Sequence, residues 1–176
     1  MSIIEEKDAI RDLMTRYCLA IDAGRDEEWV ECFTEDGIFN SPILGKFQGS
    51  DALRAFTTKY HEWTGDAQPR HCVMNILINV QGQTATAGSY LLLTHAAEGK
   101  TELIISCRYE DQIEKVGGQW RFNRPGNGVA VRHYVVEDMD LAASGLGIGA
   151  YIKANFTSGD STLPHHNLLW VGSQTD

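Results

Sequence analysis

Residues 84–116, TATAGSYLLLTHAAEGKTELIISCRYEDQIEKV, decide the fold of this chain. The turn Glu98-Gly99-Lys100 divides the stretch, and in its second half apolar residues take every other position: Leu103, Ile105, Cys107 and Tyr109. A period of two is typical of a β-strand that buries one face. The stretch therefore predicts two long antiparallel strands joined by a tight turn.

The same pattern continues on both sides of this pair. Strands are predicted over residues 71–80, 84–96, 101–116 and 119–123, with the turns Gln81-Gly82 and Gly117-Gly118 between them. Strands that follow one another at this spacing, with short turns, form an antiparallel meander.

The first seventy residues are helical in pattern instead. Apolar residues at three- and four-residue steps predict an amphipathic helix over residues 3–21. Asp26 is expected to cap a short second helix that ends near Phe33, and Ser50 a third that stops at Gly65. An extended piece at residues 38–39 and a hairpin at 44–45 lie between them. Three helices followed by a curved antiparallel sheet make an α+β fold, with the helices on one sheet face.

The length of the chain fits one domain with a C-terminal extension. It has 176 residues, and domains cluster near ~100–150. Residues 125–128, PGNG, break the strand pattern, and residues 129–136 can resume it. We expect a domain over residues 1–136 and an extension over residues 137–176 that serves as a lid or a subunit contact.

Composition excludes several classes of protein. Acidic residues number 24 and basic residues 15, for a net charge of -9, which argues against a nucleic-acid-binding protein. No apolar run reaches the ~18 residues of a membrane span, and the acidic start is unlike a signal peptide. The scattered cysteines indicate reduced core thiols of a cytoplasmic protein, with a disulfide as the alternative: Cys18, Cys32, Cys72 and Cys107.

Two further patterns do not predict a cofactor site. Gly145-Leu-Gly-Ile-Gly-Ala is similar to a dinucleotide-binding loop, but no βαβ unit surrounds it. His165 and His166 are adjacent, so on an extended chain they point in opposite directions and make a poor metal chelate. We therefore expect no metal and no cofactor.

Two residues are candidates for acid–base chemistry. Asp22 ends an apolar helical face, where a carboxylate is unexpected unless it caps, pairs or takes part in a reaction. His71 opens the first long strand, and Asn75, four residues on, is expected on the same sheet face. A carboxylate that orients an imidazole makes a general base for a proton on carbon or water. By themselves, helix-end aspartates and strand histidines are more often structural.

A longer ordered set of residues surrounds this pair. Its first part is Ile10, Leu13, Tyr17, Ile21, Asp22, Gly24, Trp29, Phe33, Asp36 and Gly37, and its second part is Gly49, Leu53, Arg70, His71, Asn75, Gly118, Trp120 and Phe122. In order and spacing the set resembles the SnoaL-like branch of the nuclear transport factor 2-like superfamily, over about residues 5–124. The resemblance implies a conical α+β barrel, in which a strongly bent antiparallel sheet wraps round the helices and encloses an apolar pocket.

The resemblance also implies roles for named residues. In relatives such as scytalone dehydratase, lindane dehydrochlorinase and bile-acid 7α-dehydratase, an Asp–His pair removes a proton while a leaving group departs. Asp22 matches that aspartate and His71 the base. Tyr17 matches a tyrosine that dehydratases offer to substrate oxygen, and Asn75 the asparagine after the histidine. An arginine often completes such pockets: Arg124 has the usual spacing, and Arg132 fits if residues 125–128 are an insertion.

These roles imply a cofactor-independent lyase, dehydratase-like, or an isomerase that acts on a hydrophobic, oxygenated small molecule. The pocket walls would come from four aromatic residues that plain core packing explains at least as well: Trp29, Phe33, Phe56 and Tyr60. Since the superfamily also contains non-catalytic small subunits of ring-hydroxylating dioxygenases and proteins that only bind ligands, both remain alternatives. Long strands that need cover on both faces predict a homodimer or homotrimer.

Overall fold

Helices precede the long strands along the chain, as the sequence predicts. The computed structural model describes residues 1–41, 44–123 and 132–136. The elements, in chain order, are α1 (Ile3–Asp22), α2 (Asp26–Val30), β1 (Ile38–Ser41), β2 (Gly45–Gln48), α3 (Ser50–Thr64), β3 (Gln68–Gln81), β4 (Thr84–Ala97), β5 (Lys100–Val116), β6 (Gln119–Phe122) and β7 (Arg132–Val136). This order confirms the predicted α+β class.

The strands form one sheet in the order β2-β1-β7-β5-β4-β3, with β6 paired to β5. The meander β3–β4–β5–β6 is antiparallel, as predicted. β7 lies between β5 and β1 and is parallel to β1, through Asn40 and His133. Since β2 and β3 are the two edges, the described strands form an open sheet rather than a closed barrel.

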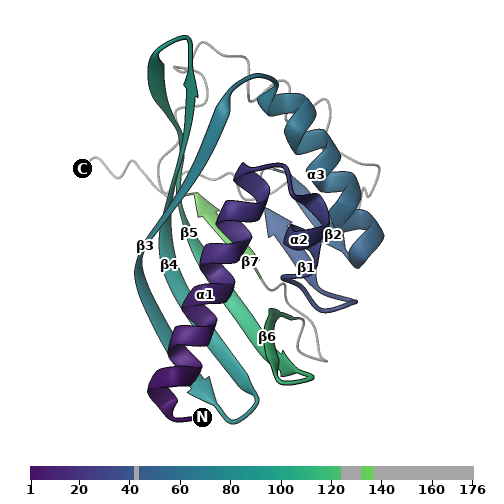
Figure 1. The fold of residues 1–176 in the computed structure, drawn as a ribbon, viewed down its shortest axis with the longest axis vertical. Helices are drawn as coiled ribbons and strands as arrows, with labels where there is room; N and C mark the ends of the chain where they lie inside the picture. Colours follow the sequence, from purple (N-terminus) through teal and green to yellow (C-terminus); the bar gives the residue numbers. More distant parts are fainter. Residues whose placement is uncertain (42–43, 124–131, 137–176) are drawn as a thin grey trace, which may run out of the picture.

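The core lies between α1 and the concave side of the long strands (Figure 1). α1 begins with a capping box, in which Ser2 and Glu5 each bond the other's backbone N–H. Its apolar stripe is buried against β3 and the sheet. The inward positions of β4 and β5 supply the opposite side of the core: Leu91, Leu93, Ile105, Cys107 and Tyr109.

Two expected helix caps are wrong by one residue. The N-cap positions are Arg25, whose side chain makes no capping bond, and Gly49, which has no side chain. Gly49 has a φ of 80°, a conformation that glycine adopts without steric cost, so it makes the sharp entry into α3. The carboxylate of Asp26 bonds Nε2 of His61 at 2.9 Å instead, which ties α2 to α3. α2 also ends at Val30, before Phe33.

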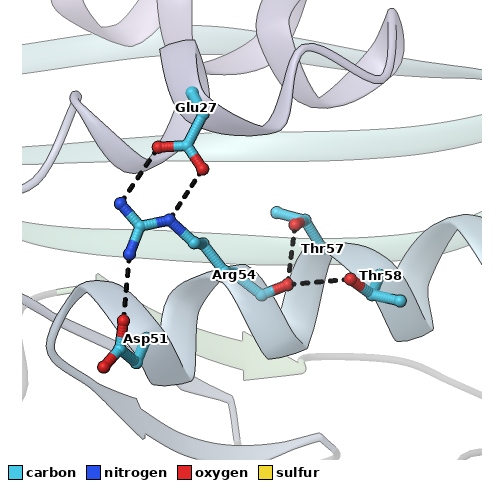
Figure 2. Close-up of polar contacts among 5 residues, drawn as sticks. All are labelled: Glu27, Asp51, Arg54, Thr57 and Thr58. Carbon is cyan, nitrogen blue, oxygen red and sulfur yellow. Dashed lines mark hydrogen bonds and ion pairs between the residues drawn. The ribbon is translucent and has the colours of Figure 1, made fainter.

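A second contact between α2 and α3 is made by Arg54. Figure 2 shows its guanidinium donating two bonds to the Glu27 carboxylate, at 2.7 and 3.0 Å, and one to Asp51 at 3.0 Å. The backbone carbonyl of Arg54 accepts from the hydroxyls of Thr57 and Thr58. Glu27 and Arg54 line a groove of about 550 Å³, which is also lined by Val116, Gly117, Gln119 and Arg121 of the β5–β6 hairpin.

The cysteines differ from expectation at one position. All four are free, and Cys18, Cys32 and Cys107 are buried, but Cys72 is exposed. Cys72 follows His71 on β3, and successive strand residues point to opposite faces, so an inward His71 places Cys72 outside. Within the described residues, none of the helices is both long and apolar enough to cross a membrane.

Candidate functional site

The structure brings Asp22 and His71 together, although 49 residues separate them. Asp22 is the last residue of α1, and His71 lies near the start of β3. One carboxylate oxygen, Oδ1, lies 2.5 Å from ring Nδ1, and the other, Oδ2, accepts the backbone N–H of His71 at 2.9 Å. Both side chains are buried, with exposed fractions of 3% for His71 and 9% for Asp22. The two bonds fix the carboxylate relative to the ring.

This geometry determines the tautomer of a neutral His71. An ionised carboxylate can only accept hydrogen bonds, so Nδ1 carries the ring proton and Nε2 carries a lone pair. The carboxylate also stabilises the positive charge that forms when Nε2 takes up a proton. Asp22 sits at the negative end of the α1 dipole, which is unfavourable for an anion, and the two donors from His71 compensate for it. The arrangement fixes the orientation of the ring and leaves the lone pair on Nε2.

Tyr17 lies on α1 in the middle of a cluster of aromatic rings. It is 1% exposed, and its ring centroid lies 5.3 Å from Trp29, 5.9 Å from Phe33 and 5.5 Å from Phe122. Trp29 in turn contacts Phe33 and Phe56. The predicted wall residues therefore belong to one buried cluster, and each of them packs as a core residue does.

Tyr60 connects this cluster to the dyad. It is 3% exposed on α3, and its ring centroid lies 6.0 Å from Phe56 and 6.1 Å from His71. Its hydroxyl is buried and has no hydrogen-bond partner among the described residues. Burial, followed by the charge of Asp22 and the nearby Tyr17, raises the pKa of Tyr60 well above its usual value. The phenol is thus a neutral donor near the dyad.

His95 is a neighbour of His71 that the sequence analysis did not identify as a candidate. It stands opposite Pro69 in the β3–β4 register, two residues from the His71–Leu93 pair, and so shares the face of His71. Its ring lies 4.8 Å from Trp63, and its Nε2 is buried without a partner in the described part of the chain. Burial, and then the neighbouring His71, lowers its pKa below 6.5, while Asp22 acts the opposite way. The two-residue alternation that buries Leu91 and Leu93 is the signal that could have identified it.

Asn75 is not placed as expected. β3 has a bulge between Met74 and Leu77, and Asn75 adopts a left-handed backbone with a φ of 54°. The bulge interrupts the alternation on which the expectation rested, and Asn75 is exposed. Arg124 and the side chain of Arg132 lie outside the described residues.

Two other features bear on the site. The groove beside Arg54 has neither Asp22 nor His71 in its lining. Residues 1–41, 44–123 and 132–136 contain no cluster of three or more His, Cys, Asp and Glu that could hold a metal ion.

Comparison with known proteins places the chain in a family. A model described as a SnoaL-like domain matches residues 2–125. A function-unknown protein from Mycobacterium tuberculosis is 27% identical, with a TM-score of 0.73 over 89% of this chain and 94% of the other. An NTF2-like protein with a cystatin-like fold from Novosphingobium aromaticivorans is 22% identical, with a TM-score of 0.68 over 82% and 90%.

A third structure, from Catenulispora acidiphila, holds the compound S-DNPA. It is 21% identical, with a TM-score of 0.64 over 74% of this chain and 94% of the other. No match to a curated protein was found. The helix–sheet order and the match over residues 2–125 agree with each other, and the chain belongs to the SnoaL-like domain family.

Proposed function

We propose that this protein is a cofactor-independent lyase, dehydratase-like, or an isomerase in which His71 removes a proton from a hydrophobic, oxygenated small molecule. The observation that carries the proposal is the buried double contact of Asp22 with the ring and the backbone of His71. One bond, to the backbone N–H of His71, links α1 to β3. The second one selects the tautomer that a base requires.

The reaction follows from the free lone pair of His71. Nε2 takes a proton from a carbon next to a carbonyl or hydroxyl function, and the electron pair of the C–H bond moves into a new double bond. In elimination, the neighbouring C–O bond breaks, and the imidazolium returns the proton to the departing oxygen, which leaves as water. In isomerisation, the proton returns to a different carbon. Tyr17 would donate to the carbonyl or leaving oxygen, and Asp22 holds the ring in place.

The test is proton exchange and water elimination without added metal or nucleotide. Aromatic ketones and hydroxy-ketones are incubated with the protein in D₂O and followed by NMR. Wild type should exchange the protons next to the carbonyl, and His71→Ala should lose about 10²–10⁴-fold of the rate while remaining folded.

His61→Ala is the matched control, because His61 also pairs with an aspartate but is only half-buried, with 29% of its side chain exposed. It should react at the wild-type rate. A His71→Ala protein as fast as wild type would contradict the proposal. Binding without turnover would favour a ligand-binding protein, and a copurifying iron–sulfur chain would favour the dioxygenase subunit.

A further inference from the structure

The described part of the chain contains several buried polar side-chain atoms that have no hydrogen-bond partner, among them Trp29 Nε1, Tyr60 Oη, Ser89 Oγ and His95 Nε2. Burying such a group without a partner is unfavourable, so each one requires an explanation. Among these residues, Tyr60 has its ring next to the His71 ring, and the charge of Asp22 contributes to the raised pKa of its hydroxyl.

We propose that the Tyr60 hydroxyl holds an oxygen atom of the substrate beside His71, and that it selects carbonyl or phenol compounds over hydrocarbons of the same shape. The inference rests on the proposed function in one respect, since it places the substrate at the dyad. The hydroxyl lies on the α3 side of the dyad, whereas Tyr17 lies on α1, so the two tyrosines can contact different substrate atoms.

Three observations support a ligand role over a structural one. The ring of Tyr60 is already packed against Phe56, Trp63 and His71, so a phenylalanine would fill the same space. The hydroxyl adds no bond to the described protein and costs desolvation. A phenol is protonated near neutral pH, and the raised pKa of Tyr60 extends this to higher pH, so the hydroxyl can donate to an oxygen acceptor.

The ligand class follows from these surroundings. Aromatic rings on the α3 side favour a flat, apolar body, and a single neutral donor matches one carbonyl or phenolic oxygen at its edge. The probes are 1-tetralone and tetralin, which share a two-ring skeleton and differ by the carbonyl oxygen. Affinities for both are measured by NMR titration for wild type, Tyr60→Phe and Tyr90→Phe. Tyr90 is an exposed tyrosine on β4 and serves as the matched control.

The ketone-to-hydrocarbon affinity ratio should fall about fivefold to tenfold in Tyr60→Phe, as expected for one lost neutral hydrogen bond. The affinity of Tyr60→Phe for tetralin should equal that of wild type. The ketone-to-hydrocarbon affinity ratio of Tyr90→Phe should also equal that of wild type. Tyr60→Phe should also unfold at the same temperature as wild type or a higher one, because the Tyr60 hydroxyl has no partner to lose among the described residues.

An unchanged ratio in Tyr60→Phe, a lowered unfolding temperature, or failure of the wild type to bind the ketone would each overturn the inference. The proposed function is judged separately, by proton exchange. A Tyr60-dependent ketone preference without any exchange would refute the base role of His71 and leave the oxygen-holding role of Tyr60 standing.

Discussion

At the scale of single residues, the contact of Asp22 with Nδ1 selects the tautomer of His71 on which the proposed base role depends. In Asp22→Asn, the amide oxygen can still accept the backbone N–H of His71, which turns the amide NH₂ toward Nδ1. Nδ1 must then accept, the ring proton moves to Nε2, and the base loses its lone pair. We expect a loss of ~10⁴-fold in kcat, with KM nearly unchanged.

The matched control for this change is Asp26→Asn. Asp26 also bonds a histidine, but in a half-buried pair between α2 and α3. The kcat of Asp26→Asn should equal that of wild type. If both asparagine variants kept full activity in the D₂O exchange assay, the orienting role of Asp22 would be wrong.

His95 should make the stability of the protein depend on pH. Its pKa in the folded state is below the unfolded value of 6.5, chiefly because it is buried. Below about pH 6.5 the unfolded chain therefore binds a proton that the folded chain resists, and the free energy of unfolding falls as the pH falls. Urea unfolding at pH 7.5 and 5.5 should show that the free energy of unfolding decreases less between these pH values in His95→Gln than in wild type. An equal loss in both would contradict this prediction.

At the scale of elements, the turn between α2 and β1 depends on Gly37. A Cβ at this position would lie 2.8 Å from Cβ of Phe33 and 2.9 Å from the Thr34 carbonyl oxygen. Phe33 is buried and packed against Trp29, so it cannot move away freely. Gly37→Ala should lower the free energy of unfolding by about 1–3 kcal/mol, the usual cost of overpacking.

Gly88 is the matched control for Gly37. It lies within β4, and a Cβ there would meet no atom within 4 Å. Gly88→Ala should leave the urea midpoint unchanged or slightly raised, because alanine has less backbone entropy to lose. Equal destabilisation by both substitutions would show that the close approach at Gly37 is relieved elsewhere.

At the scale of the whole molecule, the outer face of the sheet exposes large apolar side chains. Met74 on β3 stands opposite Tyr90 on β4, and both are exposed, at 38% and 43%. We expect a homodimer or homotrimer assembled through this face. Light scattering at micromolar concentration should give a multiple of 19.6 kDa. Tyr90→Asp should shift the mass toward the monomer, because assembly would bury an unpaired charge.

Leu19→Asp is the control for the assembly prediction. Leu19 is 56% exposed on α1, away from the sheet face. The mass of the Leu19→Asp assembly in light scattering should equal that of wild type. A monomeric wild-type protein would contradict the expected assembly.

Much of the fold could be predicted because the decisive patterns are local. The buried stripe of α1 and the alternation in β4 and β5 each depend on residues within a few positions of one another. The errors occur where a distant partner intervenes. Asp26 fits the preferences of a cap but bonds His61, 35 residues away, and the bulge in β3 exposes Asn75. β7 could not be placed because its neighbours β1 and β5 are remote in sequence.

The candidate site shows the same division. By itself, the sequence determined that helices precede the sheet and that the chain belongs to the SnoaL-like family. It also determined that an acid stands at the end of α1 and a histidine near the start of β3. Only the tertiary structure decided that Asp22 contacts both the ring and the backbone of His71. It also decided that His95 lies on the same sheet face as His71, and that the Tyr60 hydroxyl is buried without a partner among the described residues. Periodicity reports which face of an element is buried, but the contacts between elements follow from how the sheet bends around α1 and α3, and that depends on the packing of the whole chain.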